Sequence, residues 1–415
     1  MKNYNLYPRY LRSRVSEALA DTPVVLIHGP RQCGKTTLAR LIGDEGQFAY
    51  FTFDDDVQLA AAKTDPVGYV ADLPERAVLD EVQRVPELFT SLKAEVDNRR
   101  ESGRFILTGS ANVLLVPRLA DSLAGRMEIL RLHPLTQAEL AGEESSFLSR
   151  LFKADFQTGA SGQRLGMELA ERVVGGGYPA ALLRTTPRRR MAWYRDYTET
   201  LIQRDIRDLA RISALDALPR LLALAAERTA CLVNISELAA PFQVSRPTIR
   251  EYMTLLSRIF MLEELAPWHG NRMKRLIKTP KLHMGDTGLA CTLLGLDAEM
   301  LWRDRAVFGR LLETFIYQEL QRHASWHEET IIFSHFRDKD KVEIDVVLES
   351  GGRIAGVEVK ATATVTSKDF KGLRKLQDVV QKKFVAGVVL YDGGSIVPFG
   401  KELYAVPISC LWETN

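Results

Sequence analysis

The chain has 415 residues, and its 55 Lys and Arg residues nearly balance its 53 Asp and Glu residues. This balance excludes a polycationic protein, so any nucleic-acid site must be a local patch. The four cysteines lie far apart without a C-x-x-C pair, which argues against a zinc knuckle or a disulfide framework and fits a reducing compartment. Because neither an apolar leader nor a membrane-length apolar run occurs, we expect a cytoplasmic protein without a membrane span.

Residues 1–155 alternate short apolar runs with amphipathic segments. This alternation is typical of an α/β domain in which helices cover both faces of a parallel sheet. The expected strands are Val24–His28, Ala49–Phe53, Ala77–Leu79, Phe105–Thr108 and Glu128–Leu132.

Residues 29–36 read Gly-Pro-Arg-Gln-Cys-Gly-Lys-Thr, a G-x-x-x-x-G-K-T loop between an apolar strand and a helix. Glycines let backbone N–H groups wrap phosphates, and the helix N-terminus adds positive potential. We therefore expect ATP binding, with Lys35 on the β- and γ-phosphates and Thr36 on Mg²⁺. The predicted nucleotide-binding residues are Gly29, Pro30, Arg31, Gln32, Cys33, Gly34, Lys35, Thr36 and Thr37.

The strand at residues 77–79 leads directly into two acids, Asp80 and Glu81. Asp80 is expected to hold Mg²⁺, and Glu81 is expected to act as the general base for the attacking water. Ser110, or Thr108, ends the following strand and is expected to orient that water. The alternative is an ordinary charged turn after a strand.

An ATPase of this class usually needs a cation to stabilise the transition state, often one from a neighbouring subunit. Arg126, in Ala-Gly-Arg, is the first candidate, and Arg204 and Arg207 are the second. If this arginine comes from a neighbouring copy of the chain, the protein must be a homo-oligomer. The alternative for each of the three is a surface or ion-paired arginine.

Residues 156–215 are mostly helical in period and predict a lid or connector, and residues 216–300 predict a winged-helix module. Ser236 is the expected N-cap of one helix, and Ser245 caps a second helix whose first turn holds Pro247. Residues 245–283 contain eight Lys or Arg against three Glu, which indicates phosphate contact unless the module is a lid or a protein contact. The DNA-binding candidates are Arg246, Thr248, Arg250, Lys274 and Arg275.

Residues 301–415 begin with a helix and return to strands. An antiparallel hairpin of residues 342–349 and 354–360 can bring Asp345, Glu358 and Lys360 together, and Glu313 on the preceding helix can add a third acid. Such acids make a Mg²⁺ or Mn²⁺ site, and the lysine stabilises charge on a scissile phosphate. An exposed hairpin face with complementary charges is the alternative. The order of these residues resembles the PD-(D/E)XK, or restriction-endonuclease-like, nucleases.

Taken as a set, several stretches resemble a prokaryotic family that joins an AAA+-type P-loop ATPase to a C-terminal domain of unknown function. The resemblance implies an AAA+-like ATPase, a winged helix and a nuclease-like domain. The stretches are residues 29–37 (GPRQCGKTT), 79–83 (LDEVQ), 107–111 (LTGSA), 123–126 (LAGR), 176–179 (GGYP), 204–206 (RDI), 279–289 (TPKLHMGDTGL) and 357–360 (VEVK).

Two hypotheses of different classes follow. In the first, the chain is an ATP-dependent DNA-processing enzyme with Mg²⁺-dependent cleavage, for example of branched repair or recombination intermediates. In the second, it is a nucleotide-switched regulator that binds DNA or protein, and its nuclease-like domain is catalytically inactive. A small-molecule kinase is a weaker third possibility, because the basic module and the hairpin would then have no role.

Overall fold

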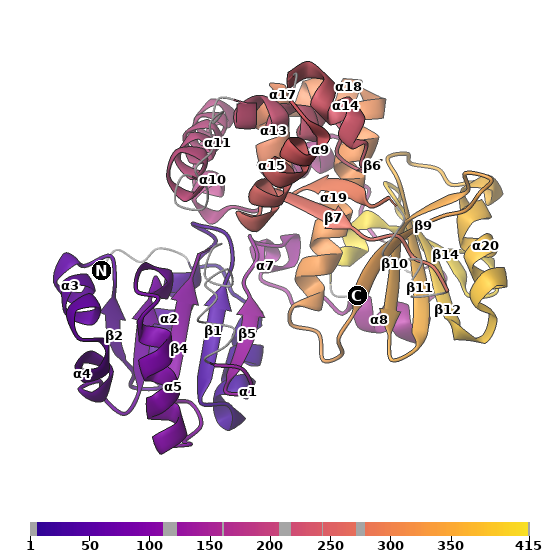
Figure 1. The fold of residues 1–415 in the computed structure, drawn as a ribbon. Helices are drawn as coiled ribbons and strands as arrows, with labels where there is room; N and C mark the ends of the chain where they lie inside the picture. The colour runs from indigo at the N-terminus through magenta and orange to yellow at the C-terminus, as the bar shows by residue number, and fades with distance from the viewer. Residues whose placement is uncertain are drawn as a thin grey trace. The chain divides into compact units, whose positions relative to one another are not determined.

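The computed structural model describes residues 6–110, 123–159, 162–206, 217–242, 244–270 and 279–413 (Figure 1). The chain divides into two compact units. The N-terminal unit comprises Pro8–Leu135 and Arg258–Phe260, and the C-terminal unit comprises Thr136–Ser257 and Met261–Asn415 with the first residues of the chain. Among the helices of the described ranges, none combines the length and the apolar character needed to cross a membrane.

The N-terminal unit contains a five-stranded parallel sheet in the order β2-β3-β4-β1-β5 (Figure 1). All five residues of strand β1, which lies between β4 and β5, are buried, because helices cover both faces of the sheet. The expected α/β architecture is therefore present here, and each expected strand is found within two residues of its predicted ends. The strands are β1 (Val24–His28), β2 (Ala49–Thr52), β3 (Ala77–Asp80), β4 (Phe105–Gly109) and β5 (Met127–Arg131).

Alternate residues of β1 enter two separate cores, one on each face of the sheet. Val25 and Ile27 pack with the apolar residues of α1 (Leu11–Asp21) and α2 (Lys35–Glu45). Val24 and Leu26 pack in the core that includes residues of α3 (Asp56–Thr64), α4 (Pro66–Ala71) and α5 (Leu88–Asn98). A 3-10 turn, Val82–Arg84, lies between β3 and α5.

The first part of the C-terminal unit is helical, as its period predicts. The 15-residue helix α11 continues into a π-helical turn, Ile202–Ile206. The helices are α7 (Gln137–Ala141), α8 (Phe147–Lys153), α9 (Met167–Gly175), α10 (Pro179–Leu182), α11 (Pro187–Leu201), α13 (Ala217–Glu227), α17 (Thr287–Leu294), α18 (Ala298–Arg303) and α19 (Arg305–Ala324).

Between α13 and α17, the described residues form two further helices and three short strands. Strand β8 pairs antiparallel with β6 on one side and with β7 on the other. The helix before the turn is capped by Asn234, whose side chain accepts bonds from two backbone N–H groups, so the expectation that Ser236 is the cap is wrong by two residues. The elements are β6 (Cys231–Leu232), α14 (Ile235–Ala239), a 3-10 turn (Ala240–Phe242), α15 (Arg246–Arg258), β7 (Leu262–Leu265) and β8 (Lys281–Met284).

A six-stranded mixed sheet in the order β13-β14-β12-β11-β10-β9 forms the rest of the C-terminal unit. The expected hairpin of β10 and β11 lies in the middle of this sheet and is largely buried, so it is not an exposed charged hairpin. Helix α20 (Lys371–Val380) lies between two 3-10 turns, Ser367–Phe370 and Gln381–Lys383. The strands are β9 (Ile332–Arg337), β10 (Glu343–Ser350), β11 (Arg353–Lys360), β12 (Phe384–Tyr391), β13 (Val397–Gly400) and β14 (Leu403–Pro407), followed by a 3-10 turn (Ile408–Leu411).

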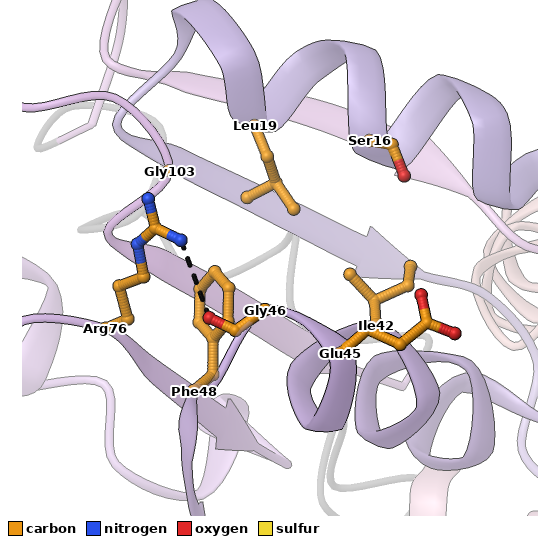
Figure 2. Close-up of a pocket in the computed structure, with 8 residues that line it drawn as sticks. All are labelled: Ser16, Leu19, Ile42, Glu45, Gly46, Phe48, Arg76 and Gly103. Carbon is orange, nitrogen blue, oxygen red and sulfur yellow. Dashed lines mark hydrogen bonds between the residues drawn. The ribbon is translucent and has the colours of Figure 1, made fainter.

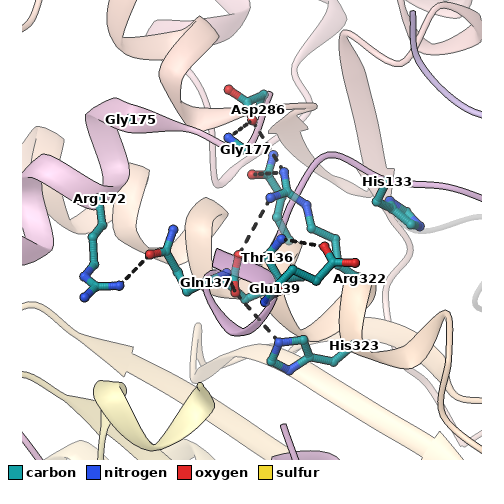
Figure 3. Close-up of polar contacts among 12 residues, drawn as sticks. His133, Thr136, Gln137, Glu139, Arg172, Gly175, Gly177, Asp286, Arg322 and His323 are labelled. Carbon is teal, nitrogen blue, oxygen red and sulfur yellow. Dashed lines mark hydrogen bonds and ion pairs between the residues drawn. The ribbon is translucent and has the colours of Figure 1, made fainter. Parts of the chain in front are cut away.

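The helices of the C-terminal unit meet at the buried carboxylate of Asp286, which is 1% exposed. It accepts hydrogen bonds from Gly177 N (2.8 Å) and Tyr194 Oη (2.9 Å), and it caps α17 through the N–H groups of residues 288 and 289. Arg322 of α19 lies 3.5 Å from it as the counter-charge (Figure 3). At Gly176 (φ 65°) a Cβ would meet both the Tyr194 hydroxyl and the Asp286 carboxylate within 2.3 Å, so this position requires glycine.

A second buried acid, Glu319, joins α19 to the start of α7. It accepts a 2.9 Å hydrogen bond from Gln137 N, and the Gln137 side chain in turn accepts a 2.6 Å bond from Arg172 of α9 (Figure 3). Burial raises the pKa of Glu319 to about 7 although Arg322 opposes that shift. The acid therefore acts as a hydrogen-bond acceptor that orients three helices.

We expect Asp286→Ala to lower the free energy of unfolding by about 3–5 kcal/mol, because the buried N–H of Gly177 loses its acceptor and Arg322 loses the nearer of two acids, with Glu319 still 3.7 Å away. Asp297→Ala is the matched control: Asp297 also caps a helix but is exposed, so its loss should cost about 1 kcal/mol. Urea unfolding followed by circular dichroism measures both. Equal losses would contradict the central role of Asp286.

Candidate functional site

The loop at residues 29–36 connects the buried strand β1 to α2, which begins at Lys35. Gly34 adopts a left-handed conformation (φ 103°) at the helix N-cap. A Cβ on Gly29 would lie 2.1 Å from the carbonyl oxygen of Leu132, so only glycine fits at the start of the loop. The guanidinium of Arg9, which the sequence did not single out, donates a 2.5 Å hydrogen bond to the Cys33 carbonyl and holds the loop from outside.

Lys35 and Thr36 both form hydrogen bonds at the start of α2. The Lys35 ammonium is buried and donates to the carbonyl oxygens of Gly29 (3.1 Å) and Pro30 (2.8 Å). The Thr36 hydroxyl lies 3.0 Å and 3.1 Å from the two carboxylate oxygens of Asp80. The structure thus brings together two of the three residues that the sequence assigned to phosphate and Mg²⁺.

Asp80 is 3% exposed, and its partners in the described part of the chain are hydroxyl groups. Besides Thr36, these are Thr108 and Tyr50, whose hydroxyl donates a 2.7 Å hydrogen bond. Burial and the hydrogen bond to Asp80 raise the pKa of Tyr50. Hydroxyl donors orient the carboxylate without neutralising it, so a negative charge remains for a cation. Tyr50 lies next to Asp80 because β2 pairs with β3, and no local sequence signal indicates this pairing.

Glu81, the expected general base, follows Asp80 in a left-handed backbone conformation (φ 62°). A non-glycine residue in this region costs on the order of 1 kcal/mol, and such strain clusters at functional sites. Gln83 links Glu81 to Ser110: its side-chain N–H groups contact the Glu81 carboxylate and the Ser110 hydroxyl, the latter at 3.1 Å. The Glu81 N–H also donates to the Thr108 hydroxyl at 3.2 Å. The predicted base and the predicted water-orienting serine are therefore adjacent.

Arg126, the first arginine candidate, does not lie at this site within the same chain. Arg126 precedes β5, and the β1–β5 register aligns Val24 with Met127, so Arg126 lies at the edge of the sheet opposite the loop that follows β1. There it forms a bidentate ion pair with Asp97, at 2.6 Å and 3.0 Å. A role in trans stays a prediction for Arg126 and for the exposed Arg204, and Arg207 lies outside the described residues.

The residues at the loop fit a nucleotide with Mg²⁺. Thr36 and Asp80 would hold the ion, and Lys35 would exchange its two carbonyl partners for phosphate oxygens. The fit rests on a buried carboxylate that has hydroxyl partners and on a loop that ends at the N-terminus of α2 with Gly34 in a left-handed conformation.

A second charged cluster lies in the C-terminal unit. Glu358 of β11 accepts a 2.7 Å bond from Lys360, and its other carboxylate oxygen has no hydrogen-bond partner among the described residues. Burial and the neighbouring Asp345 raise the pKa of Glu358 to about 8. Asp345 of β10 accepts a 3.0 Å bond from the Val359 N–H. The structure therefore brings the predicted residues of the two strands together.

Lys281 of β8 completes this cluster, although its charge was assigned to the DNA-binding patch. It is 3% exposed, and its ammonium group lies 2.5 Å from Glu313 of α19 and 3.1 Å from Asp345. Burial alone would lower the pKa of Lys281, but Asp345 and Glu313 outweigh burial and raise it above its ordinary value. Lys281 was one of the eight basic residues predicted to form a surface patch in residues 245–283. That prediction is wrong for Lys281, because a buried lysine cannot reach a DNA backbone.

The cluster does not fit a divalent metal ion in this arrangement. An ammonium group already bridges Glu313 and Asp345, the acids of the expected metal site. Within the described ranges, no group of three or more His, Cys, Asp or Glu side chains is arranged to hold a metal. Mg²⁺ and Mn²⁺ require several oxygen ligands, and the Lys281 ammonium occupies oxygens of two of the expected ones.

The expected DNA-binding residues lie partly on the exposed face of α15. Arg246 and Arg250 are exposed, and Arg250 is 3.3 Å from Glu264 of β7. Thr248 is half-buried, and its hydroxyl is 2.8 Å from that of Ser245, which caps the helix as predicted. Lys274 and Arg275 lie outside the described residues.

A basic surface that the sequence reasoning missed lies on α11. Arg188, Arg189 and Arg195 are exposed, and none of the three forms an ion pair with another described residue. The first turn of α11 contains no acidic residue. Cations near a helix N-terminus are disfavoured by the helix dipole, by roughly 0.3–1 kcal/mol each. The run of arginines in residues 188–190 was the available sequence signal.

A pocket of about 290 Å³ also occurs in the N-terminal unit (Figure 2). Leu19, Ile42 and Phe48 form its apolar wall, and Arg76 reaches across toward the Gly46 carbonyl at 3.5 Å. Arg76 directly precedes β3, so the pocket lies at the edge of the sheet where the strands begin. It is thus at the opposite edge from the phosphate-binding loop.

Three family models match the chain in succession. Residues 21–141 match an AAA domain, residues 167–300 match a Domain of unknown function (DUF8612), and residues 308–411 match a Domain of unknown function (DUF4143). Together with the loop and the parallel sheet, the first match supports a P-loop ATPase domain.

Similar proteins include two uncharacterized proteins, Mb2031c of Mycobacterium bovis and Rv2008c of Mycobacterium tuberculosis. Each is 29% identical to this chain over 403 residues, which cover 97% of this chain and 84% of the relative. Among solved structures, the Walker-type ATPase PABY2304 of Pyrococcus abyssi is 16% identical, with a TM-score of 0.43 over 70% of this chain and 96% of that one. The RuvB Holliday junction branch migration motor of Thermotoga maritima is 20% identical, with a TM-score of 0.28 over 61% and 88%.

Burial, with the charges of Arg131 and Lys35, lowers the pKa of His28 to about 4, from 6.5. Between these values the unfolded chain binds the proton and the folded chain does not, so stability falls as the pH falls from 6.5 toward 4. We expect His28 to contribute up to about 1.4 kcal/mol of this loss per pH unit. Urea unfolding near pH 7 and near pH 5 should therefore differ less in His28→Asn than in wild type, whereas His327→Asn, at a partly exposed site, should keep the wild-type difference.

Proposed function

We propose that the chain is an ATP hydrolase whose nucleotide state controls binding to DNA. One observation supports ATP hydrolysis above all: the Thr36 hydroxyl lies within 3.1 Å of both carboxylate oxygens of the buried Asp80. The neighbouring Lys35 ammonium is held by the Pro30 carbonyl of the phosphate-binding loop. Thr36 and Asp80 would hold Mg²⁺, which lowers the charge on the β- and γ-phosphates.

The roles of the remaining residues follow from their contacts. Lys35 transfers its hydrogen bonds from two loop carbonyls to phosphate oxygens. Glu81 accepts the proton of the attacking water, and Gln83 orients the Glu81 carboxylate. Ser110, 3.1 Å from Gln83 Nε2, orients the same water. This arrangement supports hydrolysis over simple nucleotide binding, because a carboxylate is positioned beyond the metal-binding residue.

We expect Lys35→Ala to abolish nucleotide binding, because the phosphates lose their main cation. Glu81→Gln should bind nucleotide like wild type but release phosphate about 10²–10⁴-fold more slowly, the range for loss of a general base. Fluorescent-nucleotide titration and phosphate-release assays separate the two effects. Glu87→Gln, at an exposed position of the same unit, is the control and should match wild type. Hydrolysis at the wild-type rate in Glu81→Gln would refute the assigned role of Glu81.

The DNA-binding half of the proposal rests on the segment from α13 to β8 and on α11. The elements follow one another in the order of a winged helix: α13, β6, α14, α15 and the β7–β8 hairpin. Strand β6 pairs with β8, the second strand of the hairpin. Arg246 and Arg250 are exposed on α15, the helix that follows the turn. Arg188, Arg189 and Arg195 of α11, which form no ion pair with another described residue, add positive charge that the phosphate backbone of DNA would complement.

We expect two double variants, Arg246→Ala/Arg250→Ala and Arg188→Ala/Arg189→Ala, to weaken binding to duplex DNA uniformly across sequences. Each should reduce the slope of log Kd against log salt by about 2, one for each lost phosphate contact. Arg303→Ala, at an exposed arginine paired with Glu299, controls for net charge and should leave the slope unchanged. Unchanged slopes in both double variants would remove the case for DNA.

DNA cleavage remains the second candidate function. The order of these residues along the chain supports cleavage: Glu313, Asp345, Glu358 and Lys360. The Lys281 ammonium between Glu313 and Asp345 instead favours a nucleotide-switched regulator whose C-terminal domain does not cut DNA. A cleavage assay on labelled duplex, single-stranded and four-way-junction DNA with Mg²⁺ or Mn²⁺ decides between them. Cleavage that is lost in Lys360→Ala would establish a nuclease.

A further inference from the structure

The C-terminal cluster collects its charges from four separate elements. Its acids come from α19, β10 and β11, and Lys360 extends from β11 beside Glu358. Lys281 comes from β8, which belongs to the three-stranded sheet with β6 and β7, and is 32 residues from Glu313 and 64 from Asp345. A residue from outside the six-stranded sheet therefore supplies the cation at its buried acids.

We propose that Lys281 is the resident cation of this cluster and that its ammonium group excludes divalent metal ions from the acids. The proposal concerns the C-terminal cluster alone and does not depend on ATP hydrolysis at the loop.

Burial makes this ion pair different from a surface salt bridge. The side chains of Lys281 and of the two acids are 4%, 13% and 13% exposed. Charges that have lost their water need a partner at contact distance, and removing one partner leaves the other uncompensated. The ammonium is thus a fixed part of the cluster and not a mobile side chain that solvent could readily replace.

A metal ion would need the same oxygen atoms. Mg²⁺ and Mn²⁺ prefer six oxygen ligands at short distances, and a nearby ammonium both occupies two of those ligands and repels the dication. One oxygen of Glu358 has no hydrogen-bond partner within the described ranges, so the cluster retains an acceptor that faces no donor. Removing the Lys281 ammonium would free oxygens of Glu313 and Asp345. Together with Glu358, these residues would then offer three carboxylates to a cation.

The test measures Mn²⁺ binding to the full chain without nucleotide, by electron paramagnetic resonance of the free ion. Wild type should show no Mn²⁺ site that depends on Asp345, as judged against Asp345→Asn. Lys281→Met should gain one Mn²⁺ site, because oxygens of Glu313 and Asp345 become available as ligands. The double variant Lys281→Met/Asp345→Asn should lose it again.

Lys360→Met is the matched control, because it removes the other lysine of the cluster while Lys281 still bridges Glu313 and Asp345. It should gain no site. Lys281→Gln is a second replacement that keeps a hydrogen-bond donor in case the methionine variant folds poorly, and Mn²⁺ should raise the unfolding midpoint of either Lys281 variant but not of wild type.

Two results would overturn the proposal. An Asp345-dependent Mn²⁺ site in wild type would mean that the ammonium gives way and that the cluster is a metal centre. Folded Lys281→Met and Lys281→Gln without any gained site would mean that another feature excludes the metal. Both readouts are independent of ATP turnover, so loss of the proposed ATPase activity would leave the result unchanged.

Discussion

The C-terminal unit is assembled around one buried carboxylate, that of Asp286. A charged group with 1% exposure has lost its hydration, so it must obtain donors from the protein. These come from the Gly176–Gly177 turn, from Tyr194 of α11, from the first turn of α17 and from Arg322 of α19. Because each donor belongs to a different element, the helices can satisfy the charge in one relative arrangement only. The same requirement excludes a side chain at Gly176.

Two other buried aspartates differ in the charge of their partners, and that difference separates the two candidate sites. Asp80 is held by the hydroxyls of Thr36, Tyr50 and Thr108, which orient it and leave its charge available. Asp345 is held by the Lys281 ammonium, which neutralises it. The first arrangement is suited to a metal ion that arrives with a nucleotide. The second arrangement needs no ion from outside.

The elements of the N-terminal unit could be predicted closely because their signals are local. Apolar runs of strand length marked all five strands, and the loop motif placed the start of α2 at Lys35. The cap at Asn234 was missed because Asn and Ser are both good caps and stand two residues apart in the sequence. Arg126 was chosen for its motif, but the register of β5 places it at the opposite edge of the sheet from the loop. Sheet register depends on pairing between distant strands, which no local pattern specifies.

The phosphate-binding loop, its flanking strand and helix, and the acids at the strand ends could be predicted from sequence, because residues close in the chain set these features. Which charges come into contact could not be predicted in this way, because it depends on how distant elements pack. Tyr50 and Gln83 join Asp80 and Glu81 through strand pairing and a turn, and Lys281 crosses from another sheet to Glu313 and Asp345. The physical reason is that a buried charge is satisfied by whichever donor the packed elements bring within about 3 Å, whatever its distance along the chain.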